Sequence, residues 1–174
     1  LENATDSGRR EIAKQVVDGL IAQDQDVADQ LGQLCATLIE NQSRDTPEVY
    51  EQERRRKLSP GEFRPEEAQR LLTDAVRLGG FLGAIDRIPR WAKSNESIGI
   101  DAGCGPVPIL AIGGAILHGH VVAYEINPSS HRIAEEAVKL FGLQDRIEVV
   151  QADVLDPKTE LPGDAWYAVS ETFG

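Results

Sequence analysis

Residues 98–108 read IGIDAGCGPVP, and this stretch decides the fold that the sequence predicts. Its first residues are apolar or small, as in a short buried strand, and the apolar run that begins at Pro106 is typical of a helix. Gly103 and Gly105 lie between them and have no Cβ, so the backbone can turn sharply there and a ligand can approach it closely. The stretch therefore predicts a strand, a tight turn and a helix, which together open a nucleotide-binding βαβ unit.

The class of ligand follows from the residues around this turn. Free N–H groups at the start of the helix can bind polar ligand atoms. A second apolar strand over residues 121–124 ends at Glu125, where an acid can accept hydrogen bonds from both hydroxyls of a ribose. The carboxylate of Asp101 suits a cationic group better than a pyrophosphate. A dinucleotide-binding turn needs glycine where this chain has Pro108, so NAD is disfavoured and an adenosine-bearing ligand with a cationic group is indicated.

Four short motifs, in this order, resemble the cofactor site of class I S-adenosylmethionine-dependent methyltransferases. They are Asp101-x-Gly103-x-Gly105, Glu125 after the second strand, Gln151-Ala152-Asp153 after a third strand, and Ser170-Glu171 after a fourth. The similarity covers about residues 92–174. It implies an α/β fold with a Rossmann-like sheet, and S-adenosylmethionine as the cofactor. The class fold has seven strands, so the resemblance also implies a sheet that is truncated after its fourth strand.

The resemblance assigns the methionine end of the cofactor to the glycine turn. Asp101 would hold the amino group, usually through water, while Gly103 and Gly105 would make room for the methionine part. The third glycine of the family pattern is Val107 in this chain. The prolines on either side of Val107 are expected to compensate, because proline is pre-shaped for the first turn of a helix.

The resemblance assigns the adenosine end to residues that follow the second and third strands. Glu125 would bind the ribose hydroxyls, and Ile126 would pack on the adenine face. Asp153 would accept a hydrogen bond from the adenine amino group. Because parallel strands end at a common edge of the sheet, these side chains are expected to share one crevice with the turn.

The motif after the fourth strand bears on the methyl acceptor. We predict this strand over residues 164–169, so that Glu171 lies near its carboxyl end, where open α/β sheets place their active sites. A carboxylate there can accept hydrogen bonds from an amine or guanidinium and align its lone pair. The sequence SETFG over residues 170–174 resembles the first acidic residue of the double-glutamate loop in protein arginine methyltransferases, whose second glutamate would lie past Gly174. Glu171 is therefore the predicted catalytic residue.

The resemblance implies an enzyme that methylates an amine nitrogen of a small metabolite or of a protein side chain. Two alternatives stay open. One is an oxygen methyltransferase that acts on a small molecule, which would need a base beyond Gly174. The other is a non-catalytic nucleoside-binding or scaffold module, in which Glu171 would be a solvated acid at the end of a strand.

Composition restricts the partners and the metal sites. The 174 residues are 41% hydrophobic, which is enough for a packed core. The net charge of −11 disfavours nucleic acid, whose phosphates are bound by Lys and Arg. Cys35 and Cys104 form no C-x-x-C pair, so neither a disulfide framework nor a metal site is predicted. The chain opens without a secretory signal and its longest apolar run is interrupted, so we expect a cytoplasmic protein with no membrane partner; a homodimer stays open.

Helices are predicted over the first half of the chain. Apolar residues at helical spacing begin after Asp6 and pause over residues 19–26, which predicts two helices. A third is predicted from Pro47, and a fourth runs from Pro65 to the pair Gly79-Gly80.

The chain is predicted to divide into two domains. We place the boundary over residues 89–97, where the helical pattern has ended and the first strand has not begun. It separates a helical N-terminal region, residues 1–90, from an S-adenosylmethionine-binding Rossmann-like domain, residues 91–174.

Four side chains have simpler structural interpretations. His118 and His120 precede the second strand, at the edge of the sheet opposite the predicted site, so we expect surface residues there rather than metal ligands or bases. Trp166 and Tyr167 lie in the fourth strand and are expected in the core of the sheet.

Overall fold

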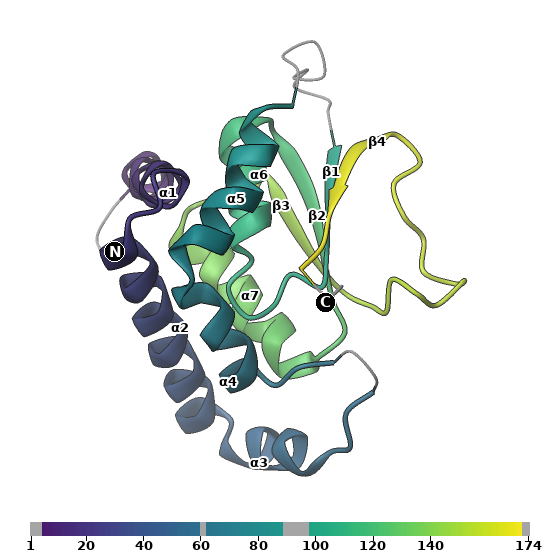
Figure 1. Ribbon diagram of the computed structural model, residues 1–174. Helices are drawn as coiled ribbons and strands as arrows, with labels where there is room; N and C mark the ends of the chain where they lie inside the picture. Colours follow the sequence, from purple (N-terminus) through teal and green to yellow (C-terminus); the bar gives the residue numbers. More distant parts are fainter. Residues whose placement is uncertain (1–4, 60–61, 89–97, 172–174) are drawn as a thin grey trace.

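The structure is a computed structural model that describes residues 5–59, 62–88 and 98–171 (Figure 1). The described residues contain a parallel four-stranded sheet in the order β3-β2-β1-β4. The strands are β1 (Ile98–Ala102), β2 (His120–Glu125), β3 (Ile147–Gln151) and β4 (Ala165–Val169). Helix α6 (Ile109–Leu117) connects β1 to β2, and α7 (Pro128–Leu140) connects β2 to β3. The predicted α/β fold with a Rossmann-like sheet is confirmed.

The register of the sheet brings the ends of its strands together. In β1, Asp101 lies opposite Ala123 of β2 and Val169 of β4. At the end of β2, Glu125 lies opposite Gln151 of β3. Since all four strands point the same way, the segments that leave β1, β2 and β4 emerge at one edge of the sheet.

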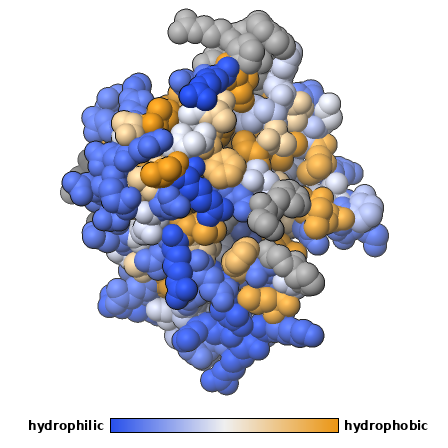
Figure 2. Space-filling view, viewed as in Figure 1, coloured by the Kyte–Doolittle hydropathy of each residue, from blue (hydrophilic) through white to orange (hydrophobic). Residues whose placement is uncertain are grey.

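The sheet is preceded by α1 (Asp6–Ile21), α2 (Gln25–Asp45), α3 (Pro47–Arg55), α4 (Pro65–Ala68) and α5 (Ala75–Asp86). The predicted break over residues 19–26 is confirmed. Asp24 caps α2 there, because its carboxylate accepts a hydrogen bond from Asp26 N at 2.9 Å. The charged helix α3 contributes a hydrophilic surface at the bottom of the view in Figure 2. None of the helices in the described part of the chain combines the length and the apolar character that a membrane span requires.

The single helix predicted from Pro65 to the glycine pair is wrong. A 3-10 helix, η1 (Gln69–Thr73), follows α4 directly. Asp74 then caps α5, since its carboxylate accepts a hydrogen bond from Arg77 N at 2.9 Å. α5 also continues past the glycines. Gly79 permits close packing on α1, because a Cβ there would lie 2.5 Å from a backbone oxygen of that helix.

Packing joins the N-terminal helices to the Rossmann-like half of the chain. α1 and α5 both contact α6, and Figure 1 shows α5 alongside α6. One hydrophobic cluster includes Leu20 of α1, Leu82 of α5 and Ile112 of α6, all fully buried. Gly113 lets α5 approach α6, because a Cβ there would lie 2.2 Å from a methyl carbon of Leu82. The predicted domain boundary, residues 89–97, lies outside the described residues.

Two predictions about single side chains are wrong. His118 is buried rather than on the surface, and its Nε2 lies 2.6 Å from Ile85 O. Trp166 is 50% exposed rather than in the sheet core, because it lies on the edge strand β4 and side chains alternate between the faces of a strand. The next residue, Tyr167, packs against a glycine of α6. His120 is exposed, as predicted.

Candidate functional site

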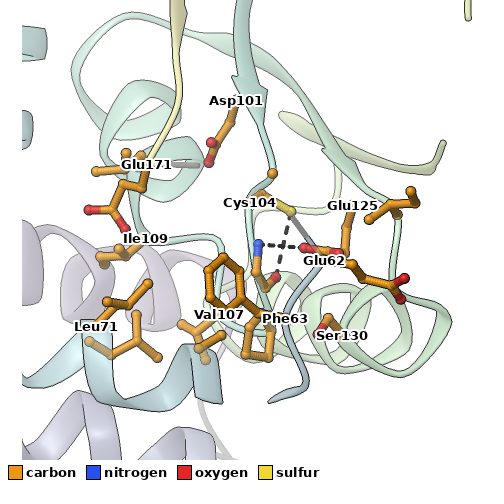
Figure 3. Close-up of a pocket in the computed structure, with 17 residues that line it drawn as sticks. Glu62, Phe63, Leu71, Asp101, Cys104, Val107, Ile109, Glu125, Ser130 and Glu171 are labelled. Carbon is orange, nitrogen blue, oxygen red and sulfur yellow. Dashed lines mark hydrogen bonds between the residues drawn. The ribbon is translucent and has the colours of Figure 1, made fainter. Parts of the chain in front are cut away.

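A pocket that is partly open to solvent lies at the carboxyl edge of the sheet (Figure 3). The strand ends contribute Asp101 from β1, Glu125 from β2 and Glu171 after β4. The N-terminal region contributes Glu62 and Phe63, which precede α4. The pocket therefore combines segments from both halves of the chain, and four of its side chains are carboxylates.

Most of the residues that the sequence assigned to the cofactor and to catalysis come together in this pocket. Its lining includes Asp101, Gly103, Gly105, Glu125, Ile126 and Glu171. Asp153 is not part of the lining. It lies exposed in the segment after β3, where its carboxylate accepts a hydrogen bond from Leu155 N at 2.9 Å. These positions do not test the predicted roles, which stay predictions.

Asp101 is 2% exposed and anchors the helix that follows the turn. Its Oδ2 accepts a hydrogen bond from Ala111 N, at the third residue of α6, at 3.0 Å. Burial raises the pKa of Asp101 to about 7, although this hydrogen bond lowers it, and the negative charges of Glu171 and Glu125 raise it further. The carboxyl group can therefore change its charge near neutral pH.

The glycine turn is held by hydrogen bonds to β2. Gly103 and Gly105 have φ angles of 79° and 69°, in the left-handed region that glycine favours. Gly103 N and Cys104 N both donate to Tyr124 O at 2.9 Å. Gly105 N donates to Oε2 of Glu125 at 2.9 Å. Three successive N–H groups are therefore engaged within the protein, and they do not form an anion-binding nest.

The start of α6 differs from its prediction. The helix begins at Ile109, so Pro106 and Pro108 precede its first turn rather than forming it. The N–H of Ile109 donates to a carbonyl two residues earlier, at 2.7 Å, and that of Ala111 donates to Asp101. Both N–H groups are thus used by the protein, contrary to the prediction of free donors for a ligand, because Asp101 is buried against this end of the helix.

Glu125 is almost completely buried, and its carboxylate is fixed at both oxygens. Oε2 accepts a hydrogen bond from Gly105 N at 2.9 Å, and Oε1 accepts one from Asn127 N at 2.7 Å. Burial raises the pKa of Glu125 above its usual value, the two hydrogen bonds oppose this increase, and the charge of Glu62 adds to it. A carboxylate oxygen has two lone pairs, so each can still accept a hydrogen bond from a ligand hydroxyl.

Glu62 is a pocket residue that the sequence analysis missed. Its carboxylate is buried and accepts hydrogen bonds from the guanidinium of Arg56, from Ser59 N at 2.9 Å and from Asn127 Nδ2 at 3.1 Å. Burial alone would raise the pKa of Glu62, but the hydrogen bonds from Arg56 and Ser59 leave it below its usual value. No spacing in the sequence signals this position, because Glu62 reaches the pocket only through tertiary packing.

Glu171 brings a buried carboxylate oxygen to the pocket. Its Oε1 has no hydrogen-bond partner among the described residues, and its ion-pair partner, Arg77, places Nε 3.7 Å away. Burial raises the pKa of Glu171, the charge of Arg77 lowers it, and that of Asp74 raises it, with a net increase. Residues 172–174, the rest of the predicted motif, lie outside the described residues.

Comparison with known proteins finds similarity over part of the chain. No protein-family model and no curated sequence matches it. The solved structure of the delta-N METTL16 MTase domain is 24% identical, covering 52% of this chain and 43% of its own, with a TM-score of 0.43. Human methyltransferase 10 domain containing protein is 23% identical, covering 55% and 46%, with a TM-score of 0.42. The StiE O-MT structure is 29% identical, covering 57% and 33%, with a TM-score of 0.41. These three structures are methyltransferase domains, and this chain spans less than half the length of each.

Proposed function

We propose that this chain is part of an S-adenosylmethionine-dependent methyltransferase and that the pocket binds the cofactor. The observation that carries the proposal is the charge of the pocket. The carboxylates of Glu62, Asp101, Glu125 and Glu171 line it, and no Lys or Arg lines it among the described residues. Arg56, outside the lining, compensates the charge of Glu62, so the other three carboxylates give the pocket its negative character. Such a pocket favours a ligand with net positive charge. S-adenosylmethionine meets this requirement, because its sulfonium and ammonium groups outweigh its single carboxylate.

The glycine turn supports this cofactor over one that carries phosphates. Phosphates bind to free backbone N–H groups at turns and helix starts in many folds of this kind. Here the N–H groups of Gly103, Cys104 and Gly105 donate to oxygens of β2. A pyrophosphate at this turn would meet the carboxylates of Asp101 and Glu125 without these donors, which is unfavourable.

The two ends of the cofactor have different candidate partners. Asp101 would face the ammonium group of the methionine part. Glu125, fixed at both oxygens, would accept hydrogen bonds from the ribose hydroxyls. Ile126, which also lines the pocket, would pack against the adenine. The proposal leaves out a contact between adenine and Asp153, since that residue is not in the lining.

Glu171 is the candidate catalytic residue. S-adenosylmethionine, when bound, supplies an electrophilic methyl group. The Oε1 of Glu171, buried and without a hydrogen-bond partner among the described residues, would accept a hydrogen bond from an amine and orient its lone pair toward that methyl group. The acceptor would be an amine nitrogen of a small metabolite or a protein side chain. The net charge of −11 disfavours nucleic acid in this role.

Calorimetric titration tests the cofactor assignment. We expect S-adenosylmethionine to bind, S-adenosylhomocysteine to bind more weakly because it lacks the sulfonium charge, and NAD to give no binding heat. Glu125→Gln should weaken binding, because it removes the charge and one acceptor oxygen. The matched control is Glu148→Gln, which makes the same change at an exposed acid of the neighbouring strand. Binding of NAD in preference to S-adenosylmethionine would overturn the proposal.

A further inference from the structure

Asn127 is 3% exposed and uses the whole hydrogen-bonding capacity of its side chain. Its Oδ1 accepts from the N–H groups of two residues in the first turn of α7, at 2.9 and 3.2 Å, and so caps that helix. Its Nδ2 donates to Oε1 of Glu62 and to Phe63 O, at 3.1 Å each. Its backbone N donates to Glu125 at 2.7 Å. One buried residue outside the lining thus contacts both halves of the pocket.

The charge of Glu62 is compensated on its other side. The guanidinium of Arg56 hydrogen-bonds to both oxygens of Glu62 and, through Nε, to Glu53 of α3 at 2.8 Å. Both oxygens of Glu62 are therefore occupied by protein donors. Glu125 keeps lone pairs for a ligand, and Glu62 acts on the pocket through Asn127. Figure 3 draws Glu62 and Phe63 in the same pocket as Glu125.

We propose that Asn127 is a positioning residue for the adenosine end of the cofactor. Its N–H fixes the carboxylate of Glu125, and its side-chain amide holds Glu62 and Phe63 against the same part of the pocket. The backbone N–H and the side-chain amide of Asn127 donate to Glu125 and Glu62, so both carboxylates can stay buried near each other. The inference rests on the proposed function, in which Glu125 binds the ribose. It implies that the N-terminal half of the chain helps to build the cofactor site as well as the core.

Substitutions of Asn127 can separate this role from helix capping. Ser and Asp are both good caps, so Asn127→Ser and Asn127→Asp retain an acceptor for the first turn of α7. Asn127→Ser loses both hydrogen bonds to Glu62 and Phe63. Asn127→Asp in addition places a negative charge against Oε1 of Glu62. The control is Asp24→Ala, which removes the cap of α2, away from the pocket.

Calorimetric titration of the whole chain with S-adenosylmethionine tests the inference, at a temperature where every variant is folded. We expect the Kd to rise about tenfold in Asn127→Asp, because this variant loses the two hydrogen bonds and also adds a repelling charge. In Asn127→Ser the Kd should rise by a smaller factor, because only the hydrogen bonds are lost. Asp24→Ala should lower the unfolding temperature and leave the Kd unchanged. Adding Glu62→Gln to Asn127→Asp removes the repelling charge and should recover part of the affinity, which loss of a merely structural contact would not allow.

Two results would overturn the inference while the wild-type protein binds S-adenosylmethionine. One is a wild-type Kd in both Asn127 variants. The other is a loss of affinity that merely follows the loss of thermal stability, with the same effect in Asp24→Ala. Failure of the wild-type protein to bind S-adenosylmethionine is a separate result, which would overturn the proposed function and this inference with it.

Discussion

The two sides of the pocket differ in how the sequence builds them. The sheet side consists of the glycine turn and the strand ends, and Gly105 meets Glu125 across only 20 positions of sequence. The helical side consists of Glu62, Phe63 and apolar residues of α4 and η1. Glu62 and Phe63 reach Asn127 across 65 and 64 positions. The sheet side can therefore be predicted from a strand, a turn and an acid that come one after another in the sequence. The helical side depends on the packing of the whole N-terminal region, so the comparison can be tested by disturbing each side alone.

The largest effect is expected from the core that joins the two sides. Leu82→Ala should lower the free energy of unfolding by about 2–5 kcal/mol, because a fully buried leucine that packs on α6 leaves a cavity. Urea denaturation measures this. The control is Val76→Ala, at a position on the same helix that is 65% exposed, where a change within about 0.5 kcal/mol is expected. Equal effects at the two positions would show that α5 does not connect the two sides.

The next effect concerns chemistry on the sheet side. Glu171→Gln should lower kcat about a hundredfold or more with an amine acceptor, because a neutral amide is a weaker hydrogen-bond acceptor for the amine N–H than a carboxylate. The Kd for S-adenosylmethionine should change little. Transfer of a labelled methyl group to a panel of amines measures the rate. Unchanged turnover in the variant would remove Glu171 from the mechanism.

A smaller effect is expected from the pH dependence of Asp101. Its pKa of about 7 means that the carboxyl group gains a proton as pH falls from 8 to 6. Attraction for a cationic ligand is lost with the charge, so the affinity for S-adenosylmethionine should fall by up to about tenfold per pH unit below the pKa. Asp101→Asn should bind weakly at both pH values. A wild-type affinity that is flat over this range would contradict the assignment.

The same pKa has a consequence of opposite sign for stability. Folding raises the pKa of Asp101 from its usual 3.8, so the native state binds the proton more tightly than the unfolded chain. The contribution of protonated Asp101 to the free energy of unfolding is fully present below pH 3.8 and is lost as pH rises through about 7. Asp101→Asn keeps an acceptor for Ala111 N without the charge, so it should unfold at a higher temperature than the wild type at pH 8. A lower unfolding temperature at pH 8 would indicate that the charged form stabilises the fold.

The smallest effect is expected at Asp153. Its carboxylate is exposed and bonds to Leu155 N, away from the lining of the pocket. Asp153→Ala should therefore change the Kd for S-adenosylmethionine by less than about threefold. A large loss of affinity would restore the adenine contact that the sequence resemblance implies.

Local signals explain what could be predicted from the sequence. The strands β1, β2 and β4, the sharp turn at Gly103 and Gly105, and the break after α1 were predicted from apolar runs, glycine and the pause in helical periodicity. These features act over a few residues, so they are visible without the fold. The convergence of Asp101 and Glu125 followed from the parallel order of the strands.

Other features depend on tertiary contacts and could not be predicted. The sequence around Glu62 resembles an ordinary helix end, and its contact with the distant Asn127 is seen only in the folded chain. His118 is buried because the end of α5 covers it, through Ile85 O. α5 continues through its glycines because α1 packs against Gly79, and this contact outweighs the low helix propensity of glycine. In each case a distant partner decides the outcome.

A crystal structure with bound S-adenosylmethionine tests the central claim most directly. We expect the ribose hydroxyls within hydrogen-bonding distance of Glu125 and the ammonium group facing Asp101, with Asn127 still bonded to Glu62. Cofactor bound elsewhere, or bound in this pocket with no contact to Glu125 and Asp101, would contradict the claim that these carboxylates select a cationic adenosyl ligand.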